Sequence, residues 1–207
     1  MKIDIPKANQ IKIIINFVLV AVIITLLVVF RKEIFKVTKS IPDNERFYKE
    51  YSMVDVDNVY KYVTASEAIE LFKSEQAIVL FGFTECKWCQ SYVPILNEVA
   101  KENGVQTIYY CNIKEDRKNK TEEYTKLVDI LKEYLYEDDN NEKRIYVPDV
   151  YFIKDGKIVG HNNDTSKIES MDTSDYYSDK TKEELKLNLT GLIKKVYDSC
   201  GDDKRGC

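Results

Sequence analysis

The sequence predicts an α/β domain, with a central mixed sheet flanked by helices, behind an N-terminal transmembrane helix. Three observations predict this arrangement in the 207-residue chain. An uncharged apolar run covers residues 13–30, and apolar segments with strand and helix periodicity alternate from Val59 onward. Two cysteines, Cys86 and Cys89, stand where an expected strand meets an expected helix. Alternating strands and helices are typical of α/β domains.

The apolar run from Ile13 to Phe30 contains no charged residue. As a helix it would be about 27 Å long, close to the roughly 30 Å of a bilayer's hydrocarbon core. A buried core helix would show a polar face, and a cleaved signal peptide would end in small residues. The run has neither feature. We therefore expect a single-pass anchor in a lipid bilayer, with a tail at residues 1–12 and a juxtamembrane linker at residues 31–58.

The charge distribution argues against nucleic acid as a partner. The first 40 residues hold seven of the 31 Lys and Arg and two of the 35 Asp and Glu, so the remainder carries a net charge of −9. A domain of that charge is repelled by phosphate backbones. No basic patch with interleaved aromatic residues follows the apolar run.

The domain is expected to span residues 59–199 and to be followed by a cysteine-containing tail at residues 200–207. Its expected strands are residues 59–63, 77–83, 105–113, 147–153 and 157–160. Its expected helices begin at the capping box Thr64–Glu67, at Trp88, at Thr121 and at Lys182. Asp155-Gly156 predicts a tight hairpin between the last two strands. The polar segments 137–144 and 161–180 are expected to be loops.

The motif Cys86-Lys87-Trp88-Cys89 indicates a reversible dithiol. Cys86 would lie at a helix N-terminus, where free N–H groups and the helix dipole stabilise a thiolate. Cys89 would lie one turn further along, within reach of a mixed disulfide on Cys86. Zinc sites use the same spacing but need two further ligands, and the chain has one histidine and no second C-x-x-C. Redox chemistry is therefore favoured over a metal, and we expect no metal and no cofactor.

Two segments in this order resemble the thioredoxin fold from about Val59 to Tyr197. The first is Phe-Gly-Phe-Thr-Glu-Cys-Lys-Trp-Cys at residues 81–89, and the second is Val-Pro-Asp-Val-Tyr-Phe-Ile-Lys-Asp-Gly-Lys at residues 147–157. The apolar run, the spacing C-x-x-C-x-x-x-x-P and the strand Ile-Tyr-Tyr also resemble membrane-anchored bacterial thioredoxin-like proteins, including bacteriocin transport accessory proteins.

The resemblance implies a membrane-anchored thiol–disulfide oxidoreductase that acts on protein or peptide disulfides and exchanges electrons with an unidentified thiol partner. Cys86 and Cys89 would be its catalytic residues. Pro148 would be cis and face the two sulfurs, and the Val147 backbone would pair with an extended substrate; an ordinary edge-strand proline is the alternative. Trp88 would either contact substrate or be half-buried packing.

The side of the membrane on which the domain lies does not follow from the charges beside the apolar run. Basic residues flank the apolar run on both sides, so charge gives no orientation. On functional grounds we expect the catalytic domain on the extracytoplasmic side of the cell membrane. The alternative function is a non-catalytic accessory or chaperone module for an exported peptide such as a bacteriocin, with a static Cys86–Cys89 bond.

The sequence departs from the thioredoxin pattern near the first cysteine. Glu85 replaces the usual tryptophan, Leu80 replaces the buried acid, and Lys-Trp replaces Gly-Pro between the cysteines. Lys87 is expected to stabilise the Cys86 thiolate and Glu85 to oppose it, so both are candidate pKa modulators. Glu85 is also a candidate for deprotonating Cys89.

The remaining cysteines and the histidine are expected to have structural rather than catalytic roles. Cys111 is expected to be a buried small hydrophobe within its strand. Cys200 and Cys207 are expected to close a disulfide loop, with a second redox pair as the alternative. His161 is expected to be a surface residue. A zinc site would require Cys111 or the tail cysteines to fold toward the C-x-x-C motif.

Overall fold

The computed structural model describes residues 19–20, 25, 41–163 and 172–197. The chain divides into two compact units, residues 1–41 and 42–207. Most of the expected anchor at residues 13–30 lies outside the described residues, as do the tail at residues 1–12 and the segment 200–207 with Cys200 and Cys207. Within the part of the chain that is described, no helix combines the length and the apolar character needed to cross a membrane.

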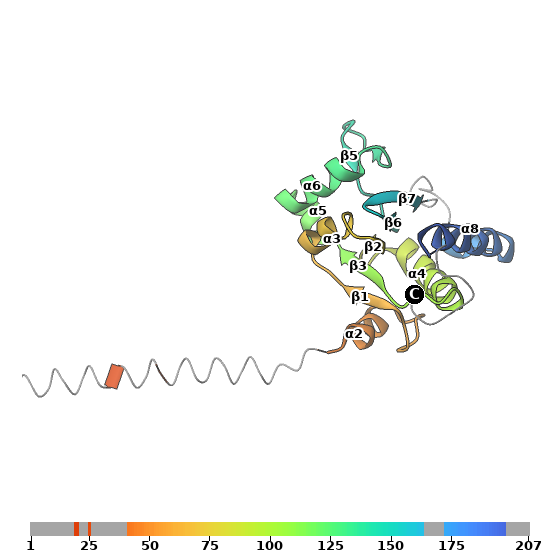
Figure 1. The fold of residues 1–207 in the computed structure, drawn as a ribbon, viewed down its shortest axis with the longest axis horizontal. Helices are drawn as coiled ribbons and strands as arrows, with labels where there is room; N and C mark the ends of the chain where they lie inside the picture. Colours follow the sequence, from red (N-terminus) through yellow and green to blue (C-terminus); the bar gives the residue numbers. More distant parts are fainter. Residues whose placement is uncertain (1–18, 21–24, 26–40, 164–171, 198–207) are drawn as a thin grey trace, which may run out of the picture. The chain divides into compact units, whose positions relative to one another are not determined.

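The second unit is built on a mixed sheet (Figure 1). Its five strands lie in the order β1 (Tyr60–Tyr62), β3 (Ile108–Asn112), β2 (Gln76–Gly82), β6 (Asp149–Lys154) and β7 (Lys157–Asn162). The first three strands are parallel to one another, and β6 and β7 run antiparallel to their neighbours. This order and these directions are those of a thioredoxin-like fold, so the expected fold class is confirmed for the domain.

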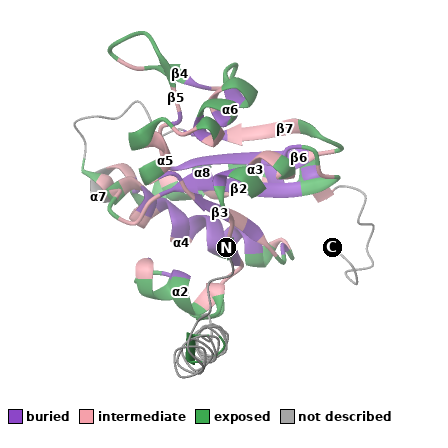
Figure 2. Ribbon diagram, turned by 90° about the vertical axis from the view of Figure 1, so that its left-hand side faces the viewer, coloured by how far each residue is buried: buried purple, intermediate pink, exposed green. Residues whose placement is uncertain are grey.

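Helices cover both faces of the sheet. The helices are α2 (Asp43–Glu50), α3 (Ala65–Leu71), α4 (Lys87–Glu102), α5 (Lys114–Asn119), α6 (Glu122–Leu131), α7 (Thr173–Tyr176) and α8 (Asp179–Tyr197). One hydrophobic core joins α2, α4 and α8 to one face, and a second joins α3 and α6 to the other. Figure 2 shows the buried residues concentrated in the sheet and on α4.

Strand β2 lies between the two cores, and its residues 77–81 form a continuous apolar run. Ile78 and Leu80 enter the core beneath α4, while Ala77, Val79 and Phe81 enter the core beneath α3 and α6. All five are at most 1% exposed. A strand covered on both faces needs a continuous apolar run, and the sequence prediction rested on that run.

Local signals in the sequence fix two junctions near the strands. Thr64 and Glu67 form the expected reciprocal capping box at the start of α3. Asp155 and Gly156 join β6 to β7 with φ values of 51° and 69°. These positive φ values suit glycine and, among other residues, Asn and Asp.

The expected linker at residues 31–58 is wrong in its second half, because the folded unit begins at Pro42. Phe47 and Tyr51 are fully buried and Val54 is 2% exposed. The Phe47 ring stacks on Tyr60 with 3.9 Å between ring centroids. These three positions have helical spacing, and that signal was hidden by the charged residues around them.

Three further segments differ from the sequence expectation. The expected loop 137–144 contains the end of a small hairpin, β4 (Tyr136–Glu137) with β5 (Lys143–Arg144). Helix α5 was not expected, because it buries none of its residues and shows no apolar pattern. The short helix α7 and the start of α8 lie in the expected loop 161–180.

Candidate active site

Cys86 lies where β2 gives way to α4. It is the N-cap residue of α4, and its Sγ accepts a hydrogen bond from the Cys89 backbone N–H at 3.3 Å. The side chain is partly exposed, whereas Cys89 is fully buried. Both are free thiols in this structure. The local sequence therefore places one accessible sulfur and one enclosed sulfur on the same helical turn.

The pKa values of the two thiols are shifted in opposite directions. The pKa of Cys86 is lowered to about 7, first by a hydrogen bond from the Cys89 side chain and then by the backbone N–H groups of Cys89 and Trp88 and the charge of Arg117, against the opposing effect of burial. Burial raises the pKa of Cys89 well above its ordinary value. At neutral pH a large fraction of Cys86 is therefore thiolate, the nucleophilic form.

The segment before β6 completes the site. The Val147–Pro148 peptide bond is cis, as the resemblance implied. The Val147 carbonyl oxygen lies 3.6 Å from Cys86 Sγ. Val147 is partly exposed and Pro148 is buried. This geometry brings the Val147 backbone to the reactive sulfur; pairing of that backbone with substrate stays a prediction.

Neither of the two expected pKa modulators is among the causes named for the lowered pKa of Cys86. Glu85 forms an ion pair with Lys114, which lowers the pKa of its own carboxyl, and its side chain is 58% exposed. Lys87 is exposed. The cation that lowers the pKa of Cys86 is Arg117 of α5. Sequence adjacency pointed to Glu85 and Lys87, whose side chains are exposed, whereas Arg117 comes from a separate helix.

Arg117 links the two segments that carry the site. Its Nη1 donates a hydrogen bond to the Ile145 carbonyl oxygen at 3.3 Å, two residues before Val147. Its Cζ lies 4.8 Å from the centre of the Phe83 ring, three residues before Cys86. No sequence signal marked Arg117, because α5 itself was not expected.

The surroundings of Cys89 contain tyrosine hydroxyls in place of a buried acid. Leu80 is fully buried in the same core. The hydroxyls of Tyr51 and Tyr110 hydrogen-bond to each other at 2.9 Å. A Cβ on Gly82 would stand 3.5 Å from both Tyr51 Oη and Cys89 Sγ. Glu85 is exposed and pairs with Lys114, and its expected part in deprotonating Cys89 stays a prediction.

Aromatic residues around the motif are mainly packing. Trp88 is partly exposed and makes edge contacts with Tyr176 and Tyr177, at centroid distances of 5.4 and 6.0 Å. Tyr92 is 2% exposed, and its hydroxyl donates to Asn162 Oδ1. A substrate contact by the exposed part of Trp88 stays a prediction.

Cys111 is buried in the opposite core from Cys89, as expected. Burial raises the pKa of its thiol to about 12, which leaves it protonated and unreactive.

His161 is not the surface residue that the sequence suggested. Its Nε2 lies 2.6 Å from Oδ1 of the fully buried Asp149, and its ring stacks on Tyr151 at a centroid distance of 4.6 Å. The lone histidine therefore serves as the polar partner of a buried carboxyl.

The described residues do not assemble a metal site. Among them, no three His, Cys, Asp or Glu side chains cluster as metal ligands would. The third described cysteine, Cys111, packs on the other face of the sheet from Cys89. The arrangement is instead that of two thiols of unequal acidity beside a cis-proline.

The strand order is that of a thioredoxin-like fold, with a dithiol at the start of α4 and a cis-proline facing it. No family model and no curated protein matches the sequence. One solved structure that resembles the chain is the oxidized form of mitochondrial thioredoxin 3 from Saccharomyces cerevisiae. The match has 17% identity and a TM-score of 0.37, and it covers 72% of this chain and 98% of that one.

Proposed function

We propose that the protein is a thiol–disulfide oxidoreductase that acts on disulfides of proteins or peptides. The observation that carries the proposal is the asymmetry of the dithiol: Cys86 is accessible with a pKa of about 7, and Cys89 is buried and protonated. One sulfur is thereby suited to attack and the other to resolve.

The reduction runs in two steps. The Cys86 thiolate attacks a substrate disulfide, forming a mixed disulfide and releasing one substrate thiolate. Cys89 then loses its proton and attacks Cys86 Sγ, which forms the Cys86–Cys89 disulfide and releases the second substrate thiolate. The substrate gains two electrons and the enzyme loses two. A thiol partner restores the dithiol, and an oxidase would run the same steps in reverse.

The backbone before Pro148 provides the surface on which the substrate would be held. The partly exposed Val147 has its carbonyl oxygen 3.6 Å from Cys86 Sγ. An extended peptide that pairs with this backbone would present its disulfide to Cys86. The exposed part of Trp88 would border the same peptide.

We also propose that residues 13–30 tether the domain to the cell membrane with the dithiol on the extracytoplasmic side. The support is the uncharged apolar run in the sequence. Disulfides of exported proteins and peptides are available on that side. An impermeant thiol reagent applied to whole cells would label Cys86; labelling only after lysis would contradict this orientation.

The function is tested by trapping. In Cys89→Ser the second step is blocked, so mixed disulfides with substrates accumulate and disappear on reduction. Cys86→Ser forms none, because the buried Cys89 does not replace the missing nucleophile. Cys111→Ser is the matched control and behaves as wild type. Non-reducing electrophoresis of each variant gives the readout. Equal trapping by the Cys86 and Cys89 variants would reject these roles.

A further inference from the structure

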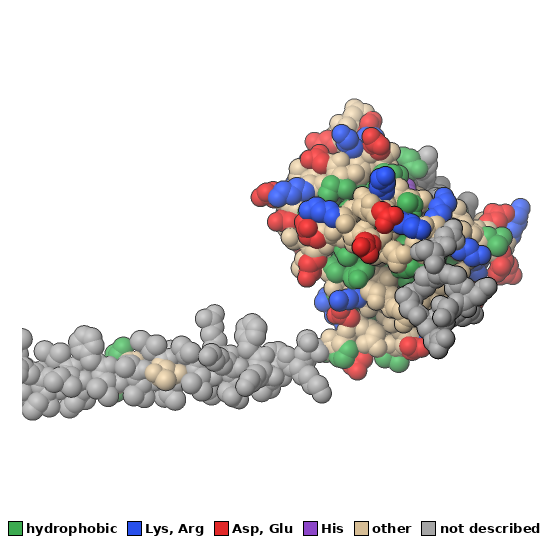
Figure 3. All heavy atoms as spheres, viewed as in Figure 1, with side chains coloured by type: hydrophobic (Ala, Val, Ile, Leu, Met, Phe, Trp, Pro, Cys, Tyr) green, Lys and Arg blue, Asp and Glu red, His purple; other side chains and the backbone are tan. Residues whose placement is uncertain are grey.

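A pocket lined by basic side chains contains Arg117, the residue whose charge lowers the pKa of Cys86. It has a volume of about 410 Å³, and its basic residues come from α5, the C-cap of α5 and β5: Lys114, Arg117, Lys118, Lys120, Lys143 and Arg144. Asp138 and Glu142 are the acidic residues in its lining. Such a concentration is unusual for this chain, because residues 41–207 carry a net charge of −9 and basic and acidic side chains are interspersed over the face in Figure 3.

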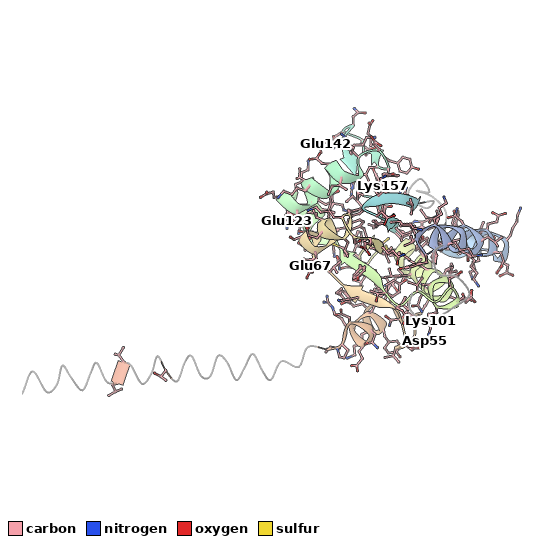
Figure 4. All side chains as sticks on the ribbon, viewed as in Figure 1. Asp55, Glu67, Lys101, Glu123, Glu142 and Lys157 are labelled. Carbon is pink, nitrogen blue, oxygen red and sulfur yellow. The ribbon has the colours of Figure 1, made fainter. Side chains whose placement is uncertain are left out.

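Nearby carboxylates already neutralise most of the lysines. Lys114 pairs with Glu85, Lys120 pairs with Glu142 at 2.7 Å, and Lys143 pairs with Glu137 at 3.4 Å. Figure 4 labels Glu142, which follows β4 on the hairpin. Neither Arg117 nor Arg144 takes part in an ion pair with any residue that the structure describes.

The two arginines form a positive pair with no carboxylate partner among the described residues. Burial first, and then the charge of Arg144, lower the pKa of Arg117. Arg144 Nε is buried and has no hydrogen-bond partner among the described residues. Desolvated charges and donors without partners cost free energy, which a bound anion would recover. A guanidinium presents N–H groups in a planar fork that matches a carboxylate.

The pair lies where a substrate would pass. Arg117 contacts Phe83 before Cys86 and the Ile145 carbonyl before Val147, and its charge reaches the Cys86 sulfur. A carboxylate that binds Arg117 and Arg144 would therefore be carried by a substrate residue only a few positions from the cysteine that Cys86 attacks.

We propose that Arg117 and Arg144 bind carboxylates of the polypeptide that carries the disulfide, so the enzyme prefers disulfides flanked by Asp or Glu. This inference rests on the proposed function and adds the chemical class of its substrate. Arg117 also acts on Cys86, so Arg144 is the cleaner position for a test.

The test compares two peptides with the full chain in its reduced form. The peptides contain the same disulfide, flanked by Asp in one and by Asn in the other, and the second-order rate constant for oxidation of the Cys86–Cys89 dithiol is measured for each. Wild type is expected to prefer the Asp peptide by about tenfold, the effect of one charge-assisted contact, and added salt lowers the preference. Arg144→Gln removes the preference, and Arg144→Lys, which keeps the charge, restores part of it.

The matched control is Lys157→Gln, which removes one exposed positive charge at the β6–β7 turn (Figure 4). Strand β6 begins beside Pro148 and ends before that turn, so Lys157 is at the far end of the strand from the site. This variant is expected to keep the wild-type preference. A preference lost equally in both variants would reflect the overall charge of the protein and would contradict carboxylate binding by Arg117 and Arg144.

The other outcomes are also decisive. Equal rates for the two peptides with the wild-type protein would reject carboxylate binding in the pocket, and the oxidoreductase function would still hold. A preference that survives Arg144→Gln would also reject carboxylate binding in the pocket. Glutathione disulfide is run in parallel: if only its exchange depends on Arg144, the carboxylates belong to a small molecule and the polypeptide proposal fails. No reaction with any disulfide overturns the oxidoreductase function itself.

Discussion

Cys86 owes its acidity to interactions from two parts of the chain. The Cys89 side chain and the N–H groups at the start of α4 are close in sequence, whereas Arg117 comes from α5. Each favours the thiolate over the thiol, and together they outweigh burial. The same burial raises the pKa of Cys89, which lacks a comparable set of donors. The division of labour between the sulfurs is therefore a property of single residues.

This account predicts the pH dependence of Cys86 alkylation. The thiolate fraction, and with it the rate of reaction with iodoacetamide, increases as pH rises through about 7 in the wild type. In Cys89→Ala the largest cause of the lowered pKa is absent, so the midpoint moves up toward the ordinary value of 9.0. Mass spectrometry assigns the modified cysteine at each pH. A wild-type midpoint near 9 would contradict the structure at this residue.

The sequence located the reactive residues but not their electrostatic environment. Cys86, Cys89 and Pro148 stand in motifs that can be read directly. Glu85 and Lys87, the modulators that sequence adjacency suggested, are both exposed, and Glu85 pairs with Lys114. Arg117 was missed because its contact with the site exists only after α5 packs beside the strand ends.

Helix α2 is the element that most changes the boundaries of the domain. It supplies Phe47 and, at its C-terminal end, Tyr51 to the core that contains Cys89. Tyr51 reaches Tyr110 and Gly82, next to the resolving cysteine. The segment before the sheet is therefore part of the wall around the site.

Two substitutions in α2 test its place in the fold. Phe47→Ala removes a fully buried aromatic ring and is expected to lower the free energy of unfolding by roughly 3–5 kcal/mol. Tyr48→Ala, the matched control, removes a ring that is 46% exposed and is expected to change stability by about 0.5 kcal/mol or less. Urea unfolding monitored by circular dichroism measures both. Similar losses in the two variants would place α2 outside the core.

Elements with strong local patterns were predictable, and elements held by tertiary contacts were not. The apolar run of β2, the capping box of α3 and the Asp155–Gly156 turn all specify their structures locally. Helix α5 buries no residue and so has no apolar pattern to detect. Helix α2 buries one residue, Phe47, among charged neighbours and so shows little apolar pattern.

At the scale of the whole domain, the site forms where separate segments meet at one end of the sheet. Strand β2 ends just before Cys86, α4 begins after it, and β6 begins just after the cis-proline. Antiparallel pairing places Phe81 of β2 opposite Asp149 of β6, which brings the cysteine motif and Pro148 together. Local sequence patterns do not specify this strand order; the resemblance to thioredoxins supplied it.

The central claim is that Cys86 and Cys89 interconvert between dithiol and disulfide as one unit. We would equilibrate the full chain across a series of glutathione and dithiothreitol redox buffers, quench with an alkylating reagent and measure each cysteine by mass spectrometry. The account predicts a single two-electron transition in which Cys86 and Cys89 are oxidised together while Cys111 remains a thiol. A Cys86–Cys89 pair that stays in one state across the whole series would contradict it.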